Sequence, residues 1–425
     1  MSDNGSHGAS RRGFLRNAGL LAAVAGSGIA AADAHEKETP AAKQTGGVEP
    51  FYGARQGGIL TPAQRHTYFA AFDLDTAKRE DVITLLRGWT DASAALTKGE
   101  QPPPVAGDSY SSEAGSDALG LGAARLTLTF GFGTSLFTKD GKDRYGLAAA
   151  RPDALIDIPK FPGDQLIEAR TGGDISVQAC ADDPQVAFHA VRRLSQLAWG
   201  VGHIRWAQTG FLPNSAPRET PRNLMGFKDG TGNLKVEDEP AIARYVFAGN
   251  DAPAWMHGGS YVVARRILIA LEHWDRMRVG FQEQAIGRHR DTGAPLGKTN
   301  EFEDLNLDAV DKDGNPVMPL NSHVRLAAAK SNDGARILRR PYSYNDGVGY
   351  TAERWPPWRQ AMEYDAGLFF ICYQSDPREG FVKIFSKLAR IDMLNQFSTH
   401  TGGGLFACPG GAAPGEYIGQ KLLSA

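Results

Sequence analysis

The first part of the chain alternates apolar and polar residues in a pattern that predicts strands separated by helices. Residues 79–96 carry apolar side chains at helical spacing, and Asp182-Asp183-Pro184 supplies an N-cap and an early proline for a second helix that runs to about Trp199. The predicted strands are residues 66–75, 125–133, 174–180 and 203–211. Strand–helix–strand taken twice is the ferredoxin-like arrangement, an antiparallel sheet with helices on one face.

A similar pattern begins again in the second part of the chain. Strands are predicted over residues 260–271, 336–344 and 367–374, with a helix around 274–284 and another that Pro377 opens and that ends near Leu394. The two parts share no sequence repeat, so their likeness is one of architecture. We therefore predict an α+β fold of two ferredoxin-like domains, residues 58–213 and 214–425.

The N-terminus has the features of an export signal. Arg11, Arg12 and Arg16 precede a mild apolar run, residues 18–32, and Ala32-Asp33-Ala34 provides small residues around a cleavable bond. The sequence around Arg11-Arg12 resembles a twin-arginine signal, which predicts the twin-arginine translocase as a partner and a periplasmic or extracellular location. The alternative is a disordered tail with a chance arginine pair. We assign residues 1–34 to the signal and 35–57 to a flexible lead-in.

Composition excludes several classes of protein. The formal net charge of −2 over 425 residues gives no electrostatic footprint for nucleic acid. No run of 18 apolar residues occurs, so stable membrane insertion is not expected. Cys180, Cys372 and Cys408 are too few and too far apart for a disulfide framework or a cysteine metal motif, and buried free thiols are the commoner case.

Three segments of the second part carry candidate chemistry. Residues 226–233 (GFKDGTGN) form a glycine-rich loop around Asp229, which could also be a simple turn or a calcium loop; an EF-hand and a phosphate-binding loop both lack their required residues. His323 lies in the segment NSHVRL, and a lone histidine is more often structural than a ligand. Arg339 and Arg340 lie on a predicted strand, where paired arginines are usually solvated or ion-paired.

Taken together, these segments resemble the dye-decolourising haem peroxidases. Residues 226–230 resemble the GxxDG loop of that family, 321–326 its axial-histidine segment and 337–340 its distal arginine strand. Further matches, in the same order as in the family, are residues 286–296, 367–374 and 401–406. Within the family the chain looks most like the twin-arginine-exported bacterial branch, which includes the deferrochelatases. The resemblance implies two ferredoxin-like halves, an arrangement like a dimeric α+β barrel, with one non-covalent haem b bound mainly by the C-terminal half.

The resemblance also implies a role for individual residues. His323 would be the axial ligand of the haem iron, and Asp229 and Arg339 would act on peroxide at the opposite face. Asp392 matches the carboxylate that orients the axial histidine, although it could equally be an exposed acid on a helix. The remaining haem-binding candidates are Gly230, Thr231, Gly232, Arg288 (a propionate partner), Ala328, Ala329, Lys330 and Arg339. Gly232 stands where some relatives have alanine, and the spacing from His323 to Arg339 also departs from some relatives.

Two functions follow from these assignments. The first is a peroxidase that reduces hydrogen peroxide while oxidising dyes, phenols or other bulky reductants. The second is a haem-handling protein that releases iron from haem, as the deferrochelatases are described to do. Asp229 and Arg339 favour the peroxidase, because a carrier needs neither residue. Electron relay by Trp255, Trp355, Trp358 or the tyrosines 342, 344 and 350 competes with simple packing of these side chains, and a homodimer is left open.

Overall fold

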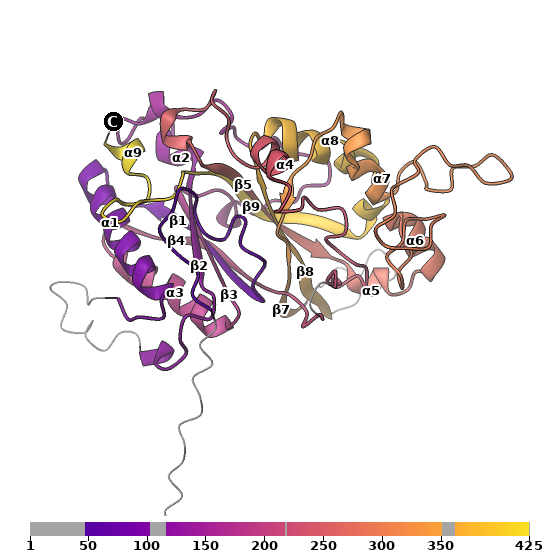
Figure 1. Cartoon of the computed structure of the whole chain (residues 1–425), viewed down its shortest axis with the longest axis horizontal. Helices are drawn as coiled ribbons and strands as arrows, with labels where there is room; N and C mark the ends of the chain where they lie inside the picture. Colours follow the sequence, from indigo (N-terminus) through magenta and orange to yellow (C-terminus); the bar gives the residue numbers. More distant parts are fainter. Residues whose placement is uncertain (1–46, 103–115, 217–218, 351–361, 425) are drawn as a thin grey trace, which may run out of the picture. The chain divides into compact units, whose positions relative to one another are not determined.

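Antiparallel strands form one sheet whose ends meet, as the computed structural model of the chain shows (Figure 1). The structure describes residues 47–102, 116–216, 219–350 and 362–424. The strands are β1 (His66–Leu74), β2 (Thr127–Gly133), β3 (Ile175–Ala181), β4 (Gly202–Phe211), β5 (Ser260–Ile269), β6 (Leu338–Arg339), β7 (Tyr342–Tyr350), β8 (Met362–Gln374) and β9 (Ser398–Cys408). Their order is β5-β9-β2-β3-β1-β4-β7-β8-β6, and β8 also pairs with β5. Eight strands therefore close into a ring, and β6 adds a short pairing to β8.

The strands of each half of the sequence stay together in this ring. The first half contributes β4-β1-β3-β2 and the second contributes β9-β5-β8-β7, so both halves have the strand order 4-1-3-2. Two seams join the halves. At one seam β2 pairs with β9 through Phe132↔Ala407 and Gly133↔Phe406, and at the other β4 pairs with β7 through Phe211↔Ser343. Hydrogen-bonded contact between the halves is thus brief compared with the long pairings inside each half.

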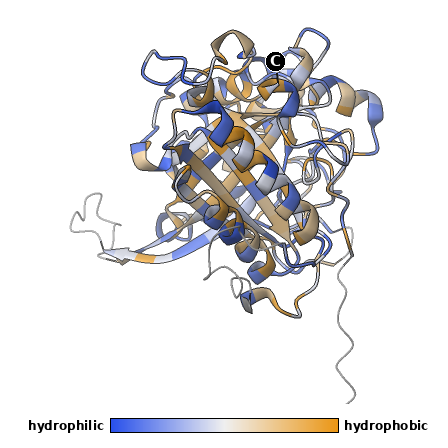
Figure 2. Ribbon diagram, turned by 90° about the vertical axis from the view of Figure 1, so that its left-hand side faces the viewer, coloured by the Kyte–Doolittle hydropathy of each residue, from blue (hydrophilic) through white to orange (hydrophobic). Residues whose placement is uncertain are grey.

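Two long helices cover the outer face of the first half. Helix α1 (Arg79–Leu96) buries Trp89 against Phe72 of β1, with ring centroids 4.9 Å apart. Helix α3 (Pro184–Leu197) begins where the sequence predicted, because the Asp183 carboxylate accepts hydrogen bonds from the backbone of Gln185 and Val186. Figure 2 shows both helices lying across the apolar strands behind them. The shorter helices are α2 (Thr134–Phe137), α4 (Glu239–Tyr245), α5 (Leu271–Trp274), α6 (Val279–Ile286), α7 (His323–Ala327), α8 (Lys383–Ile391) and α9 (Gln420–Leu423).

A second apolar cluster fills the inside of the ring. The Phe69 ring of β1 contacts Trp206 of β4, Phe369 of β8 and Phe406 of β9, with centroids 5.4, 5.6 and 6.0 Å apart. Burial of this aromatic surface joins the two halves where backbone pairing is brief. The cysteines at 180, 372 and 408 are all buried and free, as the sequence predicted.

Several predicted elements need correction. The predicted strand 336–344 is broken between β6 and β7, because Pro341 has no backbone N–H to donate. The predicted helix around 274–284 is two helices, α5 and α6, since Arg278 between them has an extended backbone (φ −64°, ψ 144°). Strand β9 was not predicted. Three consecutive glycines, residues 402–404, interrupt its apolar pattern.

The predicted flexible lead-in, residues 35–57, packs against the fold over its described part. Phe51 is 8% exposed, and the Gln56 side chain donates to the carbonyls of Phe130 and Pro409, both at 2.9 Å. The predicted signal, residues 1–34, and the tryptophans at 355 and 358 lie outside the described residues. No helix in the described ranges is long and apolar enough to cross a membrane.

Candidate active site

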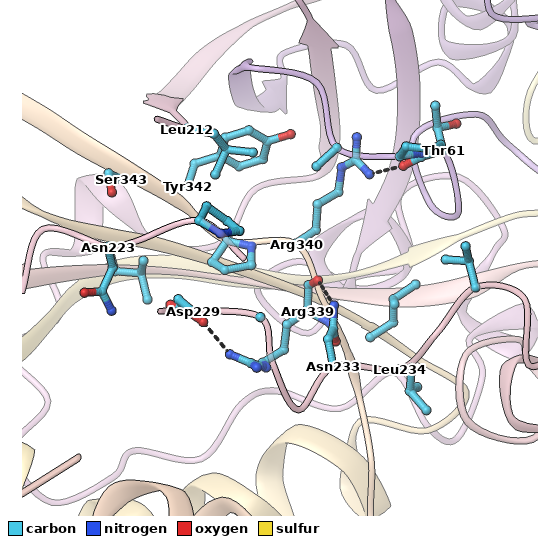
Figure 3. Close-up of a pocket in the computed structure, with 18 of the residues that line it drawn as sticks. Thr61, Leu212, Asn223, Asp229, Asn233, Leu234, Arg339, Arg340, Tyr342 and Ser343 are labelled. Atoms are coloured by element: carbon cyan, nitrogen blue, oxygen red, sulfur yellow. Dashed lines mark hydrogen bonds and ion pairs between the residues drawn. The ribbon is translucent and has the colours of Figure 1, made fainter. Parts of the chain in front are cut away.

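Asp229 and Arg339 meet as an ion pair, although 110 residues separate them in the sequence. Arg339 ends the short strand β6, and Asp229 lies in the glycine-rich loop 226–233. The Arg339 Nη1 and Asp229 Oδ1 atoms are 2.7 Å apart, as the dashed line in Figure 3 marks. Both side chains are largely buried, with 28% and 15% of their surface exposed. The pair is therefore a partly shielded carboxylate and guanidinium in direct contact.

Asn233 fixes the backbone that carries Arg339, and sequence reasoning missed this role. Its side-chain Oδ1 accepts from the backbone N–H of Arg339 at 2.9 Å, and its Nδ2 donates to the backbone carbonyl of the same residue at 2.7 Å. Strand β6 pairs with β8 on its other side, through Arg339↔Cys372. The Asn233 amide thus bonds the Arg339 backbone as a neighbouring strand would. Arg339 is therefore held by Asn233 on one edge of β6 and by β8 on the other.

The glycines of the loop provide backbone conformations that other residues rarely adopt. Gly226 and Gly230 have φ of +85° and +133°. A Cβ at Gly226 would meet only Arg290 Cδ, at 3.9 Å, and one at Gly232 would meet nothing within 4 Å. Contacts within the protein therefore do not require glycine at positions 226 and 230, but the positive φ of these two residues favours it.

A largely buried carboxylate that the sequence did not point to, Glu301, ties this loop to the segment that follows α6. Its two oxygens contact Lys228 Nζ at 2.5 Å and Thr231 Oγ1 at 2.9 Å. Burial raises the pKa of Glu301, but hydrogen bonds from Lys228, Thr220 and Thr231 outweigh burial and lower it overall. The Arg288 guanidinium, 8% exposed, donates Nη1 to the carbonyls of Gly293 and Glu301 at 2.7 and 3.0 Å. The Glu301 carboxylate therefore holds Lys228 and Thr231, which flank Asp229 in the loop, and the Glu301 backbone carbonyl accepts from Arg288.

His323 and Asp392 form the other half of the site. His323 begins α7, and its Nδ1 lies 2.7 Å from Asp392 Oδ2. The other Asp392 oxygen accepts from the backbone of Leu394 at 2.9 Å, and the carboxylate is only 3% exposed. Of the two interpretations left open for Asp392, the exposed acid is therefore excluded, and contact with His323 is observed.

The charges of the two pairs act on one another. Burial lowers the pKa of His323, but the Asp392 charge and hydrogen bond outweigh burial, and the pKa is raised overall. Arg339 lowers and Asp229 raises the same pKa. His323–Asp392 and Asp229–Arg339 are thus near enough to be parts of one site.

The other predicted haem contacts fall in two places. Gly230 and Thr231 lie in the loop beside Asp229. Ala328 follows α7 in extended conformation, and Ala329 and Lys330 begin a short 3₁₀ turn. The Lys330 ammonium pairs with Asp308 at 2.7 Å, and both side chains are exposed. Haem contact by these residues stays a prediction.

A cavity of about 220 Å³ adjoins the ion pair. Asp229, Gly230, Asn233 and Arg339 line one part of it, and Figure 3 shows Thr61 and Leu212 on other sides. The first-half residues in its wall come from the segment 59–63 and from Leu212. The cavity therefore lies between the two halves of the sequence.

Comparison with known proteins defines the class to which this fold and site belong. The family "Dyp-type peroxidase, N-terminal" matches residues 56–212, and "Dyp-type peroxidase, C-terminal" matches residues 220–413. The chain therefore belongs to the Dyp-type peroxidases, and it is a peroxidase of that type.

Individual relatives cover nearly the whole chain. It is 39% identical to a dye-decolorizing peroxidase of Thermobifida fusca, over 99% of both chains. It is 35% identical to a deferrochelatase of Escherichia coli K12, over 99% of this chain and 98% of the relative. Among solved structures, ferric DtpA from Streptomyces lividans superposes with a TM-score of 0.81 at 40% identity, covering 91% of this chain and 100% of DtpA.

Dyp-type peroxidases bind haem, and the residues present here fit that group. The His323 Nδ1 atom is hydrogen-bonded to the buried carboxylate of Asp392, and 38% of the His323 side chain is exposed. Its other ring nitrogen, Nε2, makes no hydrogen bond to the described residues. A free imidazole nitrogen within electrostatic reach of a carboxylate–guanidinium pair would supply a ligand for a haem iron and groups that can act on peroxide. In the described ranges, no three His, Cys, Asp or Glu side chains group to hold a metal without a porphyrin.

Proposed function

We propose that this chain is a haem b peroxidase that reduces hydrogen peroxide and oxidises dyes, phenols or other bulky reductants. The observation that carries the proposal is the Asp229–Arg339 ion pair, 2.7 Å across, within electrostatic reach of His323. A protein that only carries haem needs no such pair. The cavity beside it, about 220 Å³, is smaller than the roughly 300–1,000 Å³ of pockets for drug-sized molecules, so large dyes react from the surface.

When bound, haem supplies the iron at which peroxide is reduced. His323 Nε2 is the proposed iron ligand. Asp392 would orient the His323 ring by accepting a hydrogen bond from Nδ1–H, which makes the imidazole a stronger electron donor to the iron. Arg288 is the proposed partner of a haem propionate. The residues 230–232 and 328–330 are the proposed backbone and side-chain contacts of the ring.

Peroxide cleavage needs a proton moved from the inner to the outer oxygen, and charge stabilised on the oxygen that leaves. Asp229 is the proposed base for the first task, because a carboxylate can accept and return a proton. The Arg339 guanidinium is the proposed stabiliser of the leaving oxygen, because its positive charge and N–H donors can offset the negative charge that develops there. Asn233 positions Arg339 through its backbone, and Glu301 positions the loop that carries Asp229 through Thr231.

Release of iron from haem is the second candidate function. It is favoured by the likeness to proteins named deferrochelatases, at 35% identity. Such a function requires haem binding by His323 but gives no task to Arg339.

The two candidates separate in a stopped-flow experiment. Haem-loaded Arg339→Leu should change its Soret absorbance after mixing with hydrogen peroxide about 10²–10³-fold more slowly than the parent. Asp229→Asn should be milder if water relays the proton. Arg192→Leu, half exposed and paired with Asp117, is the matched control and should react at the parental rate. Parental rates in both site variants would reject the peroxidase mechanism, and iron release from haem that persists in Arg339→Leu would favour the second candidate.

The proposal extends to architecture, assembly and location. The order 4-1-3-2 in each half supports two ferredoxin-like domains, residues 58–213 and 214–425. The sequence around Arg11 and Arg12 supports export by the twin-arginine translocase to the periplasm or beyond, after haem has been bound. A homodimer is the assembly to test, by light scattering of the haem-loaded protein.

A further inference from the structure

The cavity beside the ion pair is larger than hydrogen peroxide needs. A water molecule occupies about 30 Å³ in the liquid, so hydrogen peroxide would fill only a small part of the 220 Å³. An apolar cavity of about 150 Å³ is enough to hold benzene. The space next to Asp229 and Arg339 can therefore hold a compact hydrocarbon group together with a peroxide.

The walls of the cavity away from the ion pair are mainly apolar. They are contributed by Ile59, Leu60, Leu212, Leu234, Val236 and Leu368. Ile59 and Leu234 are buried, at 2% and 4% exposed. Arg340 also lines the cavity, but its guanidinium donates to the Thr61 carbonyl and to Gln64 Oε1. A polar end and an apolar remainder are the pattern of a site for a small amphipathic molecule.

Hydrogen bonds within the fold hold the first-half residues of the cavity wall in place. The contacts of Arg340 with Thr61 and Gln64 bind the segment 59–63 to the residue that follows the catalytic candidate Arg339. Leu212 donates its backbone N–H to the Arg65 carbonyl at 2.8 Å, which fixes it beside the same segment. Hydrogen bonds therefore tie this part of the wall to the rest of the fold.

We propose that this cavity receives the carbon group of organic hydroperoxides, so that compact alkyl and aryl hydroperoxides are substrates beside hydrogen peroxide. The inference rests on the proposed peroxidase function. In a hydroperoxide ROOH the carbon is attached to the outer oxygen, which is the oxygen that Arg339 stabilises. Since Arg339 itself lines the cavity, the group R extends from that oxygen into the apolar space.

The chemistry balances with reactants already named. The O–O bond of ROOH breaks, and two electrons from the phenol or dye and two protons convert it to the alcohol ROH and water. The alcohol keeps the carbon group, so it is held in the cavity by the same apolar contacts until it leaves. The unreactive alcohol is therefore a probe of the cavity that requires no turnover.

Filling the cavity tests the proposal. Haem-loaded Leu212→Trp and, as a second variant, Val236→Phe are compared with the parent, and Leu119→Trp is the control because Leu119 is 68% exposed and outside the cavity. For each protein, kcat/KM is measured with cumene hydroperoxide and with hydrogen peroxide. We expect the ratio of the two values to fall on the order of tenfold or more in both cavity variants, and to stay parental in the control.

Binding of the product alcohol gives a second readout. Calorimetric titration of the haem-loaded protein with 2-phenyl-2-propanol should show binding to the parent and to Leu119→Trp, with affinity lowered on the order of tenfold in the cavity variants. An unchanged kcat/KM ratio together with unchanged alcohol binding in both cavity variants would overturn the proposal. Failure of the parent to react with hydrogen peroxide would instead overturn the peroxidase function, while the alcohol titration would still report on the cavity.

Discussion

At the level of single residues, His323 is the one side chain on which the proposed iron site depends. His323→Ala should fold but lose most of its haem, because His323 is the proposed ligand and its imidazole lies within electrostatic reach of the Asp229–Arg339 pair. The ratio of Soret to protein absorbance measures the loss. His203→Ala is the matched control, since His203 also pairs with an aspartate, Asp75, but is 59% exposed. Full haem content with an unchanged Soret band in His323→Ala would show that the ligand lies elsewhere.

A second histidine, His400 on β9, should make stability depend on pH. Its Nδ1 accepts from Arg265 Nε at 3.0 Å, and burial, then the Arg265 charge, lowers its pKa well below the ordinary value. Below about pH 6.5 this histidine is protonated in the unfolded chain but not in the folded chain. The free energy of unfolding should therefore decrease, as the pH is lowered, by up to about 1.4 kcal/mol per pH unit. Urea unfolding of the parent and His400→Gln at about pH 7.5 and about pH 5.5 checks this. Equal losses in both proteins would contradict the assignment.

Sequence reasoning identified the titratable groups of the site but not their supports. Asp229, Arg339, His323 and Asp392 were named from motif residues, and the structure brings them together as two pairs. Asn233 was quoted as the end of the glycine loop yet given no task, because its partner is 106 residues away. Glu301 had no signal of its own. An ordinary glutamate becomes a support only when folding buries it beside Lys228 and Thr231.

At the level of elements, β9 depends on a glycine where the chain passes closest to its neighbour. Gly403 has a φ of +134°, and a Cβ there would lie 1.9 Å from the Ala264 carbonyl oxygen of β5. Gly403→Ala should therefore lose on the order of 4 kcal/mol or more of folding stability. Gly349→Ala on β7 is the matched control, because nothing lies within 4 Å of its Cβ. Melting followed by circular dichroism compares the two, and equal melting temperatures would refute the argument.

The predictability of each element follows from how continuous its pattern is. The four strands of the first half were predicted almost to the residue, because each is short and bounded by turn residues or a cap. Strand β9 was missed because three glycines interrupt its apolar pattern, and the close approach that explains Gly403, to Ala264 of β5, is not visible in the sequence. The break between β6 and β7 has a local signal, Pro341, that the apolar pattern around it outweighed.

At the level of the whole molecule, the proposed export route makes a prediction about location. Replacing Arg11 and Arg12 together by lysine should leave the precursor in the cytoplasm, because the signal is read by a receptor and charge alone does not satisfy it. Arg16→Lys is the control and should be exported. Immunoblots of the cell fractions make the comparison, and export of the double variant at the parental level would point to another route.

The closed ring of strands also has a consequence for synthesis of the chain on the ribosome. The first half emerges with both outer edges of its sheet open, since β2 waits for β9 and β4 waits for β7. The partner of β2, strand β9, begins only at Ser398, long after the first half has been made. Exposed strand edges are templates for pairing with other chains. A nascent chain should therefore stay prone to aggregate until β9 has emerged, and truncation after α8, which removes β9, should leave the β2 edge open and lower the yield of folded protein.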